Sequence, residues 1–296
     1  MYKMSEYSFI AGVLTVALAF GCYLIAFISI RVASRRKGLA AAGAGASTAT
    51  GASTATGALG LGTYGTLLTY LALAFLTASL LFRAVVTGHG PFSNMYEFSV
   101  AFAWGTLAMF LYFERRYHQR VIGLVALPFA LLMLLYAMSV PSTINPLVPA
   151  LQNNFLLSVH VAVAIVAYGT FTVAFATAVL YLIQGKNGRP GLPSRKLLDE
   201  ISYKAVMIGF PFLTLTIVLG AVWADVAWGR YWSWDPKETA SLVTWLIYGS
   251  YLHARVARGW RDERASYLLL LGFIAVLFTY FGNLFFGGLH SYSGLG

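Results

Sequence analysis

The chain has 296 residues, of which 59% are apolar and 10% are charged, and its formal net charge is +10. A soluble globular domain carries about 25% charged residues, so this composition excludes that class and predicts a polytopic membrane protein. The single cysteine, Cys22, excludes an intrachain disulfide, and we expect it to be a small buried residue of the first apolar segment.

Eight apolar segments are each long enough to cross a membrane as a helix, which requires about 17 to 25 residues. They cover residues 8–31, 63–86, 96–113, 121–139, 155–183, 204–223, 238–254 and 266–286. The expected fold is therefore an all-α polytopic membrane protein with eight transmembrane helices. The first segment is too long for a cleavable signal peptide and a basic cluster follows it, so we expect it to remain as an anchor.

The Lys and Arg residues predict how these helices are oriented. If the N-terminus lies outside, sixteen of the twenty Lys and Arg residues fall in segments on the inner side, where such residues are retained. Both termini are therefore expected on the outer, extracytoplasmic side of the plasma membrane. The positive net charge follows from this topology and does not indicate nucleic-acid binding, although the inner face should attract anionic lipids of the bilayer.

Residues 38–62 are a low-complexity segment in which ASTATG occurs twice in tandem, at 46–51 and 52–57. Uncharged stretches of Gly, Ala, Ser and Thr are typical of flexible linkers. The expected organisation is a first helix with a basic cytoplasmic end over 1–37, a cytoplasmic linker over 38–62, and a seven-helix domain over 63–296.

The outer segment at about 223–238 is unusually rich in tryptophan and in charge. Four of the seven tryptophans fall within twelve residues, at positions 223, 228, 232 and 234, and charged residues of both signs stand among them. One or two tryptophans per helix end would suffice as interfacial anchors. Aromatic faces can stack on a large flat apolar ligand, and Arg or Lys can bind its carboxylates. Composition alone therefore indicates a membrane haem or quinone protein.

Two histidines fall inside predicted helices, where an ionisable residue is costly and suggests function. His160 lies about five residues into its helix, above a face of small residues, and the alternative is a hydrogen-bonded helix-contact histidine. His253 lies near the inner end of its helix, and the alternative is an interfacial histidine whose ring reaches toward water. The face that His253 shares also carries Glu238, Trp245 and Gly249. His89 and His290 lie in outer segments.

Several motifs together resemble one family of membrane proteins. The stretch "WGRYWSWDPKE" (228–238) resembles the tryptophan-rich WWD signature of the haem-handling proteins of cytochrome c maturation. Four further stretches are similar to the CcsA, or ResC, branch of that family: "GHGPFSNMYEF" (88–98), "LLSVHVAVAIVAYG" (156–169), "TWLIYGSYLHAR" (244–255) and "GGLHSYSG" (287–294). The resemblance runs from about residue 65 to the C-terminus.

The resemblance implies a function in cytochrome c maturation. CcsA-type proteins act with a second membrane protein, CcsB (ResB), to move haem b across the membrane. At the outer face the haem is attached to the CXXCH motif of apocytochrome c through two thioether bonds. The chain is then one subunit of a two-protein cytochrome c synthase, or haem lyase, and thiol-reducing proteins that act on the apocytochrome are further expected partners.

The resemblance also implies roles for individual residues. His160 and His290 match the family's two outer haem ligands, and His253 matches its intramembrane ligand, whose mate is expected on the CcsB partner. The residues expected to form a haem platform, with Asp235 ordering the loop, are Trp228, Tyr231, Trp232, Trp234 and Asp235. Supporting positions are His89, Arg230, Lys237, Glu238, Trp245 and Gly249.

Two other functions stay open from the sequence. A haem exporter or chaperone that delivers haem to a carrier, as CcmC-type relatives do, is the nearer one, but those proteins usually have six helices. A b-type cytochrome for electron transfer needs paired histidines at two depths in the membrane, and here only His253 is deep.

Overall fold

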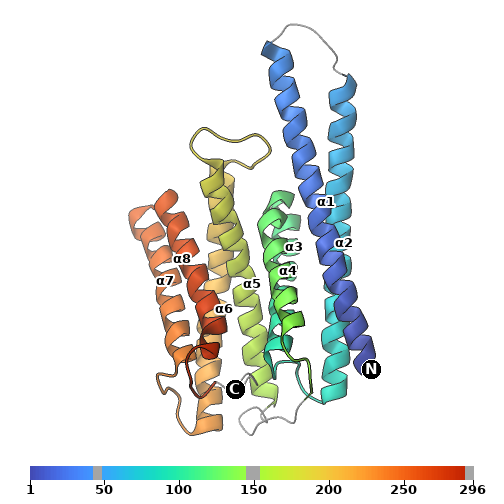
Figure 1. The fold of residues 1–296 in the computed structure, drawn as a ribbon. Coiled ribbons are helices and arrows are strands. Elements are labelled where there is room, and N and C mark those ends of the chain that lie inside the picture. The colour runs from blue at the N-terminus through green and yellow to red at the C-terminus, as the bar shows by residue number, and fades with distance from the viewer. Residues whose placement is uncertain (43–48, 145–153, 291–296) are drawn as a thin grey trace.

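The computed structural model describes residues 1–42, 49–144 and 154–290, and over that range it is a bundle of helices (Figure 1). The described residues contain eight α-helices and no β-strand, which confirms the expected all-α fold. The helices are α1 (Tyr2–Ala42), α2 (Ala49–Thr87), α3 (Met95–Tyr117), α4 (Gly123–Ser139), α5 (Asn154–Gln184), α6 (Arg195–Trp228), α7 (Pro236–Arg258) and α8 (Glu263–Phe281), with two short 3-10 helices, η1 (Arg120–Ile122) and η3 (Gly282–Leu284).

Six of the described helices are long and apolar enough to cross a membrane, namely α1, α2, α4, α5, α6 and α8. The helices α3 and α7 are not among these six, and both carry charged residues near their ends, such as Glu97 and Glu114 in α3. Both nevertheless run alongside the other helices in the bundle (Figure 1).

Several helix boundaries differ from the expectation, most of all those of α1 and α2. α1 continues to Ala42 and α2 begins at Ala49, so both helices extend into the segment expected to be a linker, of which residues 43–48 lie outside the described part. Alanine is the best helix former, and Ser and Thr are tolerated in helices, so the Ala-rich composition can prolong both helices. α8 ends at Phe281, five residues before the expected end, where the chain tightens into η3.

Consecutive helices pack as antiparallel pairs, α1 with α2, α3 with α4, α5 with α6 and α7 with α8, and α5 also packs on α3 and α8. Large apolar side chains fill the space between the pairs, and Phe171 of α5 stacks on Tyr248 of α7 with 3.8 Å between ring centroids. This alternation brings one set of connections together at one end of the bundle. We call it the loop end; it carries the N-terminus and the segments 88–94, 229–235 and 282–290 (Figure 1).

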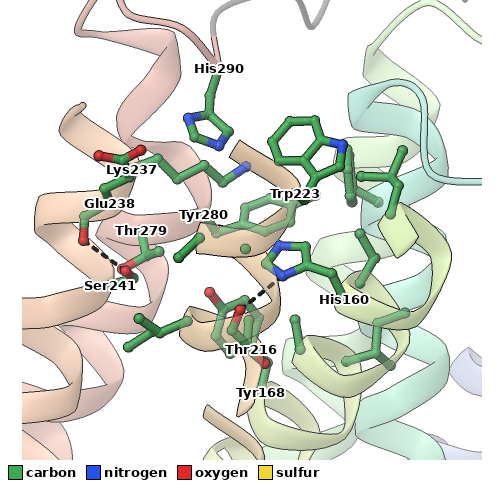
Figure 2. A pocket seen from close by; sticks show the side chains of 18 of the residues that line it. His160, Tyr168, Thr216, Trp223, Lys237, Glu238, Ser241, Thr279, Tyr280 and His290 are labelled. Carbon is green, nitrogen blue, oxygen red and sulfur yellow. Dashed lines mark hydrogen bonds between the residues drawn. The ribbon is translucent and has the colours of Figure 1, made fainter. Parts of the chain in front are cut away.

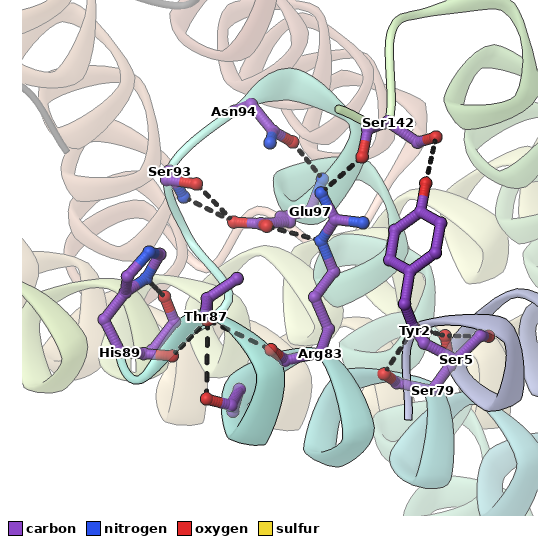
Figure 3. A network of polar contacts seen from close by, with 12 residues as sticks. Tyr2, Ser5, Ser79, Arg83, Thr87, His89, Ser93, Asn94, Glu97 and Ser142 are labelled. Atoms are coloured by element: carbon purple, nitrogen blue, oxygen red, sulfur yellow. Dashed lines mark hydrogen bonds and ion pairs between the residues drawn. The ribbon is translucent and has the colours of Figure 1, made fainter. Parts of the chain in front are cut away.

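A buried ion pair anchors the loop end (Figure 3). Arg83 of α2 and Glu97 of α3 are 2% and 1% exposed, and their Nε and Oε1 atoms are 2.5 Å apart. Arg83 also donates to the Ser142 carbonyl at 2.7 Å, and Glu97 accepts from the Ser93 amide at 2.7 Å. Loss of one partner of a buried pair typically costs about 3 to 5 kcal/mol. The pair therefore holds α2, α3 and two loops together beside the groove described next.

Candidate functional site

A groove opens at the loop end between α3, α5, α6, α7 and α8 (Figure 2). It has about 1070 Å³ of empty space, part of which is open to solvent. Its walls are mainly apolar. The lining residues that carry nitrogen atoms or aromatic rings and could bind a ligand come from four separate parts of the chain: His160, Trp223, Tyr231, Trp232, Lys237 and His290. The two histidines predicted as outer ligands are 130 residues apart in sequence and line the same groove.

His160 lies in the second turn of α5, and contacts with α6 fix its ring. Its Nδ1 atom is 2.9 Å from the Thr216 carbonyl oxygen. A side chain at Gly220 would lie 2.8 Å from the His160 ring, so the glycine allows the imidazole to rest against α6. Because a carbonyl only accepts, Nδ1 of His160 carries the proton and Nε2 keeps its lone pair.

His290 is held by the carboxylate of Asp235. Its Nδ1 atom is 2.8 Å from Asp235 Oδ1, and the two side chains are 15% and 2% exposed. The other carboxylate oxygen, Oδ2, accepts from the Leu289 amide at 2.6 Å, so the chain segment that carries His290 is docked on Asp235. The remainder of this tail motif, residues 291–294, lies outside the described residues.

The electrostatics of this pair favour a neutral ring next to an ionised carboxylate. Burial lowers the pKa of His290, although the hydrogen bond to Asp235 acts in the opposite direction. Burial would raise the pKa of Asp235, but hydrogen bonds from His290 and from the amides of Lys237 and Leu289 lower it to about 2. The carboxylate accepts from Nδ1, so Nε2 of His290 is again the nitrogen with the lone pair. A carboxylate partner of this kind orients a metal-binding histidine and increases its basicity.

Asp235 and Glu238 also build the start of α7. Asp235 accepts from the Lys237 amide at 3.0 Å, and the Glu238 side chain returns to the Asp235 amide at 3.2 Å, which completes a capping box with Pro236 at the first helical position. Glu238 further accepts from the Ser233 amide at 2.8 Å. Glu238 therefore holds the loop before α7, while the Asp235 carboxylate both caps α7 and holds His290.

Two tryptophans, Trp223 and Trp228, pack against the rings of the two groove histidines. Trp223 is 2% exposed, and its ring lies at 13° to that of His160 with 6.5 Å between centroids. Trp228 meets Trp223 edge-on at 4.8 Å and His290 edge-on at 4.9 Å. The indole Nε1–H of Trp223 has no hydrogen-bond partner within the described residues.

Trp223 was not among the site residues expected from the sequence. A signal for it exists, because Thr216, Gly220 and Trp223 recur at helical spacing on one face of α6. That face meets His160.

The other aromatic residues of the loop differ in position. Tyr231 and Trp232 line the groove. Trp234 is 68% exposed, has the left-handed backbone angle φ of 60°, and meets Trp232 edge-on at 5.7 Å. Arg230 is exposed and is not among the groove's lining. A left-handed φ is uncommon for a residue with a side chain and accompanies functional loops.

Four further expected residues lie away from the groove. His253 is exposed near the opposite end of α7. Trp245 donates its indole N–H to Thr214 of α6 at 2.9 Å, and Gly249 faces the Phe210 ring. His89 lies in the 88–94 loop, with Nδ1 2.8 Å from the Gly90 carbonyl oxygen (Figure 3).

The residues of the groove suit a large, flat, metal-centred ligand such as haem. Two imidazoles offer Nε2 lone pairs, and aromatic rings supply apolar surface. The Trp223 indole N–H next to them has no hydrogen-bond partner in the part of the chain that the structure describes. Axial ligands and the surrounding apolar and hydrogen-bonding contacts are the means by which a protein controls haem.

Comparison with known proteins identifies the family. The model of the cytochrome C assembly protein family matches residues 92–290. The cytochrome c biogenesis protein CcsA of Guillardia theta is 38% identical over 78% of this chain and 85% of its own length. The CcsA of Chlamydomonas reinhardtii is 42% identical over 72% of this chain and 64% of its own length, and that of Prochlorococcus marinus (strain MIT 9312) is 38% identical over 76% and 83%.

A solved structure shows a similar fold. The cytochrome c haem lyase CcmF superposes with a TM-score of 0.61 over 93% of this chain, at 20% sequence identity. This chain spans about half of that protein's length, since the match covers 46% of it. The likeness at this identity concerns the fold. The family match over 92–290 includes His160, Asp235 and His290, and with the curated relatives it confirms that the chain belongs to the cytochrome c assembly protein family, in its CcsA branch.

Proposed function

We propose that this chain, together with a CcsB (ResB)-type membrane protein, carries haem b across the plasma membrane and presents it for covalent attachment to apocytochrome c. The observation that supports this most directly is the arrangement of His160 and His290. Both line one groove, and each has its Nδ1 atom against an oxygen acceptor at 2.9 or 2.8 Å. Each ring is thereby oriented with Nε2 as the metal-binding atom.

The loop end faces the extracytoplasmic side in this proposal. Most Lys and Arg residues lie in the segments of the opposite end, and such residues are retained in the cytoplasm. The loop end would therefore meet an apocytochrome after its export, with its N-terminus and the segment that carries His290 on the outer side.

Haem is the substrate, and the chain's residues position it. Each thioether bond forms when a cysteine thiol adds across a haem vinyl group, sulfur to one carbon and hydrogen to the other, so that no external oxidant is required. His160 and His290 hold the iron, Tyr231 and Trp232 cover the macrocycle, and Trp228 supports His290. Holding two reactants in a fixed orientation can lower the activation free energy of their reaction by several kcal/mol. The CXXCH histidine replaces one ligand, and thiol-reducing proteins keep both cysteines reduced.

The test of this function is coexpression of the chain with a ResB-like protein and an apocytochrome c that carries CXXCH. Covalent haem on the apocytochrome, scored after denaturation, is expected only when both membrane proteins are present. Attachment without this chain contradicts the proposal. Haem delivered to a carrier protein without thioether formation would instead favour the exporter function.

His253 is expected to receive haem on the inner side, with a histidine of the partner as second ligand. Its exposure on α7, outside the groove, suits a ligand shared with another protein. A His253→Ala variant of the purified complex is expected to lose haem at both the inner and the outer site, measured by absorbance per complex. The matched control is Val256→Ala, because Val256 lies one turn further on α7 and is 77% exposed. Unchanged haem content in His253→Ala rules out this entry site.

A further inference from the structure

Lys237 is a cation inside the groove whose ammonium forms no ion pair with a carboxylate of the described residues. It lies in the first turn of α7, its side chain is only partly exposed, and it is part of the groove's lining. Figure 2 shows the amino end pointing between His290 and Trp223. Its Nζ atom lies 5.4 Å from the centroid of the Phe98 ring.

The two carboxylates nearest in sequence are already engaged. Asp235 accepts from His290, from the Leu289 amide and from the amide of Lys237 itself. Glu238 accepts from the amides of Ser233 and Asp235. Neither carboxylate comes within ion-pair distance of the Lys237 ammonium in the described structure. The hydrogen-bond donors of both carboxylates are thus other groups than the Lys237 ammonium.

An ammonium group in a mainly apolar groove is stabilised when an anion binds to it. Removing a charge from water is costly unless the charge is paired, and a charge-assisted hydrogen bond to a carboxylate is among the stronger polar contacts. Asp235 and Glu238 already accept hydrogen bonds from other groups. We therefore expect the carboxylate that pairs with Lys237 to belong to the ligand. Haem carries two propionate carboxylates on one edge of an otherwise apolar ring.

We propose that Lys237 binds one propionate of the haem and thereby sets the rotation of the macrocycle about the axis between His160 and His290. Two axial ligands leave that rotation undetermined, and a single anchored edge determines it. With the propionate edge at Lys237, the vinyl groups lie on the remaining edges, away from α7. Lys237 is in this sense a positioning residue for thioether formation, and its role rests on the proposed function.

The test compares haem with its dimethyl ester, which keeps the iron, the vinyl groups and the ring but has no carboxylate. Dissociation constants of both porphyrins for the purified complex are measured from the Soret band in wild type, Lys237→Met and Lys237→Gln. Wild type is expected to favour haem over the diester by about 10-fold to 100-fold, the worth of a charge-assisted hydrogen bond. Both variants are expected to bind the two porphyrins within about threefold of each other.

Lys3→Met is the matched control, because Lys3 is an exposed lysine of α1 at the same end of the bundle. It is expected to keep the wild-type preference. The inference is overturned if Lys237→Met and Lys237→Gln keep that preference, or if Lys3→Met loses it to the same extent. The proposed function fails separately if neither porphyrin gives a bis-histidine spectrum with wild type. A normal spectrum with no preference between the porphyrins overturns the role of Lys237 alone.

Discussion

Replacing His160 or His290 by glycine is expected to abolish covalent haem attachment to apocytochrome c, and added imidazole is expected to restore part of it. Each variant removes one Nε2 ligand and leaves a space of imidazole's size. The loss should exceed about 100-fold, since removing a group that only orients a metal ligand already costs 10-fold to 100-fold. The measurement is the yield of covalent haem on the apocytochrome, with and without imidazole.

The matched control is His118→Gly. His118 is exposed, follows α3 at the opposite end of the bundle, and has φ of 53°, a conformation that glycine adopts readily. This variant should fold and mature cytochrome c as wild type does, with no response to imidazole. Normal maturation by both His160→Gly and His290→Gly would show that the groove's histidines are not the outer ligands.

An Asp235→Asn variant is expected to lower haem affinity at the outer site by about 10-fold to 100-fold, as loss of a carboxylate partner does for metal-binding histidines. Asparagine caps helices about as well as aspartate, so the start of α7 should persist. What is lost is the negative charge against His290 Nδ1, 2.8 Å away. The measurement is haem affinity together with the ferric/ferrous reduction potential, and an unchanged affinity and potential would contradict the role given to Asp235.

The contribution of Asp235 depends on pH in a defined direction. Its pKa falls from an ordinary value of 3.8 to about 2 in the folded chain. A carboxyl whose pKa is lowered by folding stabilises the fold above its ordinary pKa, and this stabilisation is lost as pH falls through the lower value. Between about pH 4 and pH 2 the docking of the His290 segment should therefore weaken in wild type, and Asp235→Asn should remove this dependence.

Substitutions at two neighbouring glycines test whether the segment that carries His290 packs against Asp235, because an added side chain changes the shape of the segment and not its charge. A side chain at Gly288 would collide with the Asp235 carboxylate and lie 3.0 Å from Pro236, whereas one at Gly287 would meet nothing within 4 Å. Gly288→Ala should therefore lower haem retention as Asp235→Asn does, and Gly287→Ala should not. Equal behaviour of the two alanine variants would show that the segment is not held against Asp235.

Much of the fold could be predicted from the sequence because its signals are local. Apolar runs of membrane-spanning length predict the helices, and all eight α-helices of the described residues match them. The sequence "DPKE" at 235–238 combines a capping residue, a proline and a glutamate at the spacing that starts a helix. The end of α8 and the prolongation of α1 and α2 were not predicted, because hydrophobicity alone does not mark where a helix stops.

The candidate site could be predicted only in part. Motif resemblance pointed to His160, His290 and the aromatic loop, and the structure brings both histidines to one groove with Tyr231 and Trp232. It separates Trp234, which is 68% exposed, from that lining. The packing of Trp223 against His160, and the position of the Lys237 ammonium away from the carboxylates of the described residues, depend on side-chain directions that no spacing in the loop reveals.

The sequence by itself determined the class of this protein: a helical membrane chain of the cytochrome c assembly family, with histidines and tryptophans gathered in and near the segments between its helices. These properties follow from composition, from runs of apolar residues and from motifs, all of which are read over short stretches of chain. Only the tertiary structure decided how each histidine is held. The contacts of His160 with the Thr216 carbonyl and of His290 with Asp235 join residues 56 and 55 positions apart. Such pairings arise when separate helices pack and bring distant groups within hydrogen-bonding distance, so they cannot be read from local pattern.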